Sequence, residues 1–64
     1  MSSQFMTVKD VQNVLGVSAS KAYDIIRKLN AQLDEQGYIT IRGKVSRIYF
    51  EKKLYSKEGV VNVG

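Results

Sequence analysis

Polar and basic side chains gather at the start of one predicted helix. They are Ser18, Ser20, Lys21, Tyr23, Asp24, Arg27 and Lys28. Serine hydroxyls and the N–H groups of a helix N-terminus bind phosphate oxygens, and lysine and arginine reach phosphate or guanine. A tyrosine reaches a phosphate or the methyl group of thymine. These residue types at this spacing fit contacts to double-stranded DNA. The alternative is an ordinary solvated helix surface, and the basic hairpin described below favours DNA.

Asp24 is the exception in this set, because a carboxylate near the DNA backbone repels phosphate. It suits the surface if it accepts a hydrogen bond from cytosine, or if it pairs with Lys28. We favour the pairing, because side chains four residues apart are neighbours on an exposed helix.

A second basic cluster surrounds Gly43. The whole net charge of +4 falls within residues 37–64, because residues 1–36 carry as many acids as bases. Residues 38–41 and 47–49 are rich in β-branched and aromatic residues and predict two strands joined by a hairpin, in which Gly43 supplies a positive φ. We expect this hairpin to be a wing that contacts the DNA backbone or minor groove. Its contact residues are Arg42, Lys44, Ser46 and Arg47.

Two helices must position these side chains. Thr7, with Asp10 three residues later, predicts a helix start, and Gly16 predicts its end after Leu15. Ser18 predicts the start of a second helix over residues 19–36, which Gly37 stops. Apolar positions recur on one side of each helix: Val8, Val11, Val14 and Leu15 on the first, and Ala22, Ile25, Ile26, Leu29 and Leu33 on the second.

Two helices joined by a short glycine-containing turn form a helix-turn-helix, whose second helix enters the major groove. Val11, Leu15, Val17, Ala22 and Ile25 are expected to hold the pair together, and Phe50 and Leu54 in a closing helical turn over residues 50–55 to cover the core. The predicted fold is α+β, mainly α: a winged helix-turn-helix of residues 7–55. We expect residues 1–6 to be a flexible arm and residues 56–64 a flexible tail.

Composition excludes several functions. The chain has no cysteine or histidine, so it contains no disulfide, no thiolate or imidazole metal site and no Cys/His nucleophile. Asp34 and Glu35 are adjacent on a helix and point to different sides, which makes them a poor acid/base pair. We expect neither enzyme activity nor a cofactor. The chain has no long apolar run and no signal peptide, so we expect a cytoplasmic, nucleoid-associated protein with no membrane contact.

Residues 7–11, 15–18 and 21–26 resemble the N-terminal part of the small excisionase-like, MerR-related winged helix-turn-helix proteins. Residues 43–44, 47–49 and Leu54 are similar to the basic wing of that family and its next helix. Gln12 departs from the family, which usually has a small alanine there. No coiled-coil helix or effector domain follows the wing, so we do not expect metal or drug sensing.

The resemblance implies DNA contacts by Ser18, Ser20, Lys21, Tyr23 and Arg27, and by Arg42, Lys44 and Arg47. It also implies an excisionase, or recombination directionality factor, of a phage or integrative element that bends DNA near an attachment site and favours excision by an integrase. An alternative is a small transcriptional regulator of a mobile element. A less favoured alternative is a protein-interaction module, whose apolar contact would be Val60, Val61 and Val63. The expected partners are double-stranded DNA, an integrase and further copies of the chain bound cooperatively to DNA.

Overall fold

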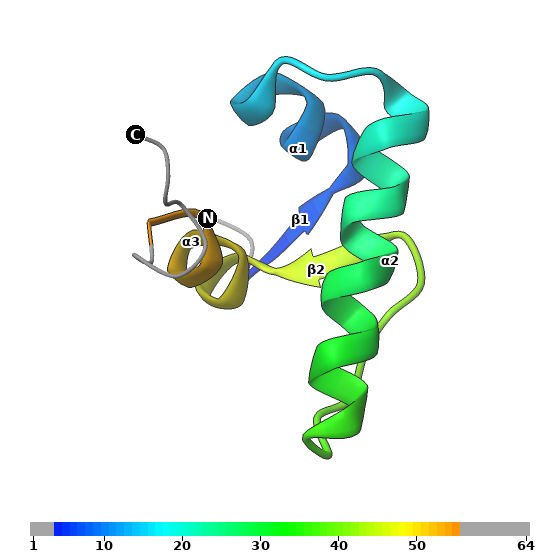
Figure 1. Ribbon diagram of the computed structural model, residues 1–64, viewed down its shortest axis with the longest axis vertical. Helices are drawn as coiled ribbons and strands as arrows, with labels where there is room; N and C mark the ends of the chain where they lie inside the picture. Colours follow the sequence, from blue (N-terminus) through cyan, green and yellow to red (C-terminus); the bar gives the residue numbers. More distant parts are fainter. Residues whose placement is uncertain (1–3, 56–64) are drawn as a thin grey trace.

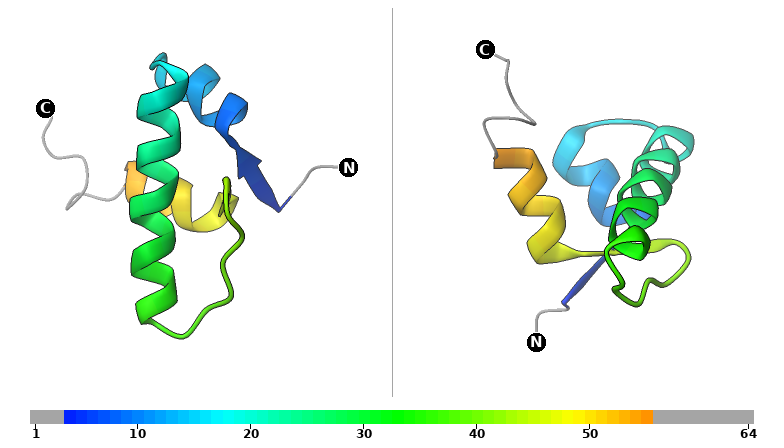
Figure 2. Two further views of the ribbon diagram at one scale, coloured as in Figure 1. Left: turned by 90° about the vertical axis from the view of Figure 1, so that its right-hand side faces the viewer. Right: turned by 60° about the horizontal axis from the view of Figure 1, so that its bottom comes forward.

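Three helices enclose a small sheet in the computed structural model, which describes residues 4–55. In chain order the elements are β1 Phe5–Thr7, α1 Val8–Leu15, α2 Ala19–Glu35, β2 Lys44–Ser46 and α3 Arg47–Tyr55. Helix α2 stands along one side of the molecule, α1 packs across its N-terminal half, and the sheet lies between α2 and α3 (Figures 1 and 2). The predicted mainly helical α+β fold of the winged helix-turn-helix type is confirmed.

The helix starts follow local capping chemistry. The Thr7 hydroxyl accepts a hydrogen bond from the Asp10 backbone N–H, and the Asp10 carboxylate accepts one from the Thr7 N–H, which forms a capping box. The Ser18 hydroxyl caps α2 by accepting from the Lys21 N–H. Gly16 ends α1 with a φ of 69°, a left-handed conformation that favours glycine. Both predicted helices are confirmed, and α2 ends one residue earlier than expected.

The sheet is closed by the N-terminal segment. Strands β1 and β2 pair antiparallel with Met6 opposite Val45, and both of these side chains are buried. The prediction of a flexible arm is therefore wrong for Phe5 and Met6, although residues 1–3 lie outside the described part of the chain. The physical reason is non-local, because β2 offers Met6 both a hydrogen-bonding edge and a covered apolar site. The predicted flexible tail, with Val60, Val61 and Val63, also lies outside the described residues.

The predicted hairpin between strands at residues 38–41 and 47–49 is wrong. Ile41 makes only an isolated bridge to Lys44, whose N–H donates to the Ile41 carbonyl at 3.1 Å across a tight turn. Residues 47–49 begin α3 because the Ser46 hydroxyl accepts from the Tyr49 N–H and caps the helix directly after β2. We call residues 40–44 the wing turn; it lies at the end of the loop that leaves α2 and runs back beside it (Figure 2).

Every element contributes to one core. Its buried side chains are Met6, Val11, Ala22, Ile26, Leu33, Val45 and Phe50. Leu54 packs against this cluster, as the sequence predicted, whereas Val14 is 53% exposed and leaves the apolar side expected for α1. None of the helices within residues 4–55 is long and apolar enough to cross a membrane.

Candidate DNA-binding surface

The N-terminal part of α2 presents the predicted recognition residues to solvent. Ser20 and Lys21 are exposed in its first turn, and Arg27 and Lys28 follow about two turns later. Ser18 is exposed but already accepts a hydrogen bond as the cap, so its hydroxyl proton is the group that remains for an external acceptor. These predicted recognition residues are therefore exposed along the N-terminal half and the middle of α2.

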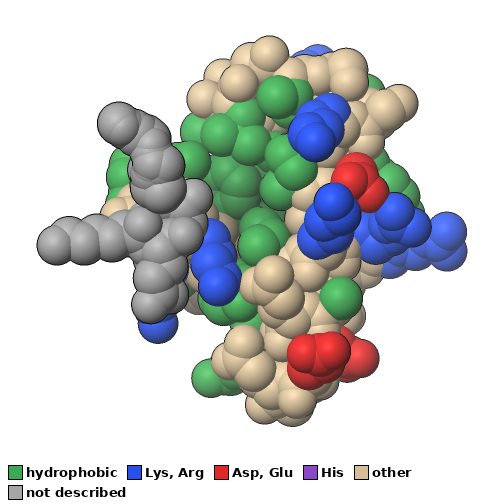
Figure 3. Space-filling view, viewed as in Figure 1, with side chains coloured by type: hydrophobic (Ala, Val, Ile, Leu, Met, Phe, Trp, Pro, Cys, Tyr) green, Lys and Arg blue, Asp and Glu red, His purple; other side chains and the backbone are tan. Residues whose placement is uncertain are grey.

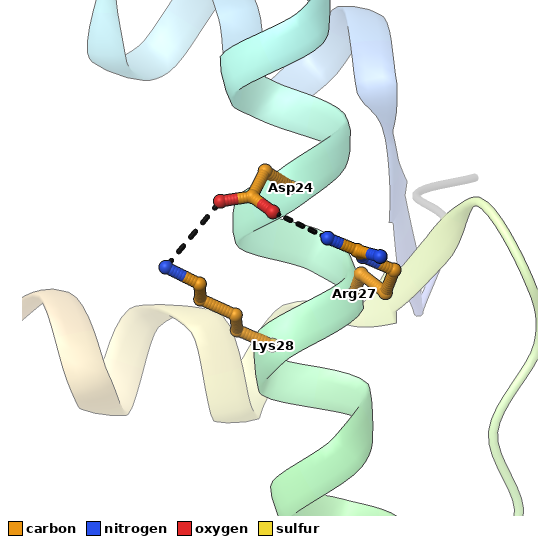
Figure 4. A network of polar contacts seen from close by, with 3 residues as sticks. All are labelled: Asp24, Arg27 and Lys28. Atoms are coloured by element: carbon orange, nitrogen blue, oxygen red, sulfur yellow. Dashed lines mark hydrogen bonds and ion pairs between the residues drawn. The ribbon is translucent and has the colours of Figure 1, made fainter.

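Asp24 joins the two cations that follow it (Figure 4). Its carboxylate accepts from Arg27 Nη2 at 2.7 Å and pairs with Lys28 Nζ at 3.4 Å. The predicted Asp24–Lys28 pair is confirmed. The Asp24–Arg27 pair was not predicted, although side chains three residues apart are also neighbours on a helix. The hydrogen bonds from Arg27 and then Lys28 lower the pKa of Asp24. Both pairs therefore persist at neutral pH and are lost only as the pH falls through that lowered pKa.

A side-chain hydrogen bond joins the wing turn to α2. Arg42 Nε donates to the Tyr23 hydroxyl oxygen at 3.1 Å, across 19 positions of sequence. This bond raises the pKa of Arg42. The guanidinium of an arginine is charged at neutral pH in any case. Residues predicted separately for the helix and for the wing thus meet at one place.

Asn30 anchors the wing turn and was not among the predicted residues. Its Nδ2 donates to the Ile41 carbonyl at 3.1 Å and to the Lys44 carbonyl at 2.8 Å. Both amide protons are therefore used on the two ends of the turn. A sequence signal existed, because Asn30 follows Tyr23 by seven residues and Ile26 by four, which places all three on one side of the helix. The spacing alone did not reveal the role of Asn30, because the predicted hairpin put the turn in the wrong place.

The four predicted wing residues divide into two pairs. Arg42 and Lys44 are exposed at the wing turn. Ser46 is half-buried in β2 as the cap of α3, and Arg47 is the half-buried first residue of that helix, with its N–H donating to the Gln4 carbonyl at 2.9 Å. The turn therefore presents two of the four side chains, and the other two support the junction of β2 with α3.

Comparison with known proteins agrees with the sequence resemblance. No protein-family model matches the chain, and no solved structure matches it significantly. Over 52 residues the chain is 56% identical to the ICEBs1 excisionase of Bacillus subtilis (strain 168), an alignment that covers 81% of each chain. The chain belongs to the ICEBs1 excisionase family. The predicted resemblance to excisionase-like proteins of mobile elements is confirmed.

Charge is unevenly distributed along α2 of this excisionase-family fold. Lysine and arginine side chains cluster over the upper half of the helix and beside it, with an acidic side chain among them, and further acidic side chains lie at its lower end (Figure 3). The first turn contains no acid and the last turn no base. The last two residues of the helix are Asp34 and Glu35. The basic half of α2 is also the half that Arg42 contacts, so the positive surface spans both elements.

Proposed function

We propose that this protein is an excisionase that binds double-stranded DNA near an attachment site, bends it and favours excision of an integrative element by an integrase. The identity to the ICEBs1 excisionase over most of both chains is the observation that carries the proposal. The protein acts by shaping DNA and by contacting the integrase, copies bind neighbouring sites cooperatively, and strand cleavage is left to the integrase. It works in the cytoplasm, on the nucleoid.

Two surfaces divide the DNA contacts. The exposed face of α2 enters the major groove, and the wing turn lies over the adjacent backbone. The contact residues are Ser18, the cap that precedes α2, and within the helix Ser20, Lys21, Tyr23, Arg27 and Lys28. Asp24 pairs with Arg27 and Lys28 and so reduces the positive charge that these two offer to DNA. Arg42 and Lys44 extend the contact from the wing turn, while Ser46 at the end of β2 and Arg47 at the start of α3 support it. Phosphate contacts supply most of the affinity, and the few base contacts and DNA deformation supply specificity.

Salt-titrated binding and excision test this function together. The purified protein should prefer the attachment region of its element over random duplex, with a slope of log K against log salt of about −4 to −5 if four to six phosphates are neutralised. Circularly permuted fragments should show a bend, and removing the gene should lower the amount of excised circular element. The matched control is Lys52→Ala, which removes an exposed cation from α3 and should change binding little. Absence of bending together with unchanged excision would contradict the proposal.

A further inference from the structure

A crevice opens between the middle of α2 and the wing turn. Its walls are formed by Tyr23, Ile26, Arg27, Asn30, Thr40, Arg42 and Gly43. We propose that this crevice binds a single phosphate group of the DNA backbone, with Arg27, Arg42 and Tyr23 as its ligands. The inference rests on the proposed DNA binding and names the group that this part of the surface recognises.

The crevice is rich in hydrogen-bond donors. Arg42 uses Nε to bind Tyr23, and its two terminal nitrogens have no partner among the described residues. Because the Tyr23 oxygen accepts that bond, its own proton is left to donate elsewhere. Arg27 uses Nη2 on Asp24 and keeps its other N–H groups. A phosphate oxygen accepts from all three side chains, and charge-assisted bonds from arginine are the strongest of these.

The local charge also fits an anion. Of the residues that line the crevice, Arg27 and Arg42 are cations and none is an acid. The nearby carboxylate of Asp24 pairs with Arg27 and with Lys28, and neither Asp24 nor Lys28 lines the crevice. Arg42 has no carboxylate partner among the described residues, and its one positive charge matches the one negative charge of a DNA phosphate. The crevice therefore still attracts phosphate with both ion pairs of Asp24 formed.

The walls are fixed before any ligand arrives. The two hydrogen bonds of Asn30 hold the wing turn against α2, and Ile26, which is 1% exposed, anchors the same wall in the core. The hydrogen bond from Arg42 to Tyr23 orients the guanidinium across the crevice. Pre-positioned groups lose less conformational entropy on binding, which favours recognition of one phosphate at a defined place on the duplex.

Single-phosphate substitution tests the inference. The probe is a set of duplexes of one bound sequence, each with one phosphate replaced by an uncharged methylphosphonate. One position should weaken wild-type binding by about tenfold, as expected for loss of a charged hydrogen bond. Arg27→Ala and Arg42→Ala should each weaken binding to the unmodified duplex by a similar factor. Neither should weaken binding further to the duplex modified at that shared position.

Two further variants sharpen the result. Tyr23→Phe keeps the ring, removes the hydroxyl and should reduce sensitivity to the same position, with a nearly unchanged melting temperature because the hydroxyl is exposed. Lys21→Ala, outside the crevice, should still weaken binding to the modified duplex. Sensitivity of Arg27→Ala and Arg42→Ala to different phosphates would overturn the shared site and leave the proposed function standing. Failure of the wild-type protein to bind DNA would overturn both.

Discussion

Asp24 places a negative charge in the middle of the surface that we propose to meet DNA. It is bound by Arg27 and Lys28, whose side chains are 70% exposed. The carboxylate thus holds two cations in place and also competes with phosphate for them. Tethering of this kind reduces binding to any duplex and leaves sequence preference to the side chains that reach base edges.

The substitution Asp24→Asn tests this competition. Removing the charge releases Arg27 and Lys28, so affinity for random duplex should rise roughly threefold to tenfold and the salt slope should steepen by about 1. Preference for the attachment region should fall, while the melting temperature changes little because exposed ion pairs contribute little stability. Salt-titrated fluorescence anisotropy on both duplexes measures these effects.

Asp34→Asn is the matched control, since it makes the same chemical change at the exposed far end of α2. It should raise affinity much less. Equal gains from the two substitutions would show that only total charge matters and that Asp24 has no special role.

At the scale of the elements, Asn30 joins the wing turn to α2, the helix that we propose to enter the major groove. The wing turn has no second strand of its own, and its two ends are held by one amide on α2. An ordinary hairpin wing is fixed by its own ladder of hydrogen bonds. Here the wing cations are positioned by contacts with other elements: the two hydrogen bonds of Asn30, the bond from Arg42 to Tyr23 and the pairing of Lys44 with Thr7.

Asn30→Ala should therefore affect both stability and binding. Loss of two hydrogen bonds should lower the free energy of unfolding by about 1–3 kcal/mol. The wing turn is then held only by the bond from Arg42 to Tyr23 and by the pairing of Lys44 with Thr7. Lys44→Ala should therefore weaken DNA binding less in the Asn30→Ala background than in the wild-type background. Chemical denaturation and a double-mutant cycle on DNA affinity provide the measurements.

Asn13→Ala in α1 controls for removal of an exposed amide from a helix. Full additivity of Asn30→Ala and Lys44→Ala would mean that the turn keeps its position without the anchor.

Local and non-local features differ in how well the sequence predicted them. The caps at Thr7 and Ser18 act within three residues, so both helices of the helix-turn-helix were predicted to within one residue. The pairing of Met6 with Val45 joins distant parts of the chain, and no local pattern indicates it. The β-branched and aromatic run at 47–49 predicted a strand, but the adjacent Ser46 cap decides for helix.

The same distinction holds for the candidate site. The exposed face of α2 follows from helical periodicity, and the Asp24–Lys28 pair follows from spacing. The contacts of Arg42 with Tyr23 and of Asn30 with the wing turn require knowledge of how the loop returns to the helix. Composition indicated that the wing was basic, but only the fold places Ser46 and Arg47 away from its tip.

At the scale of the whole molecule, the fold depends on a small core to which every element contributes. Met6 is among the largest of the fully buried side chains and comes from a strand of three residues. Small domains bury a limited fraction of their surface and are marginally stable, so each buried side chain is a large part of the total. The short strand β1 is therefore essential to the core rather than an appendage.

Met6→Ala should lower the free energy of unfolding by about 2–5 kcal/mol, because it removes a fully buried side chain and leaves a cavity. Urea denaturation followed by circular dichroism measures the loss. Val14→Ala, on the exposed side of α1, should change stability by only about 0.5 kcal/mol. If the two substitutions had similar effects, β1 would not be part of the cooperative core.

The charge distribution of α2 has a thermodynamic consequence for the fold. Acids near the N-terminus of a helix and bases near its C-terminus interact favourably with the helix macrodipole. Helix α2 has the opposite arrangement, with Lys21 near its N-terminus and Asp34 and Glu35 at its C-terminus. The Ser18 cap and the buried stripe must offset this adverse polarity. Exchanging the acidic and basic residues between the two ends of α2 would make the helix more stable. It would also place negative charge at the N-terminus, where it repels nucleic acid. If α2 binds DNA as we propose, helix stability and DNA binding therefore favour opposite charges at its N-terminus.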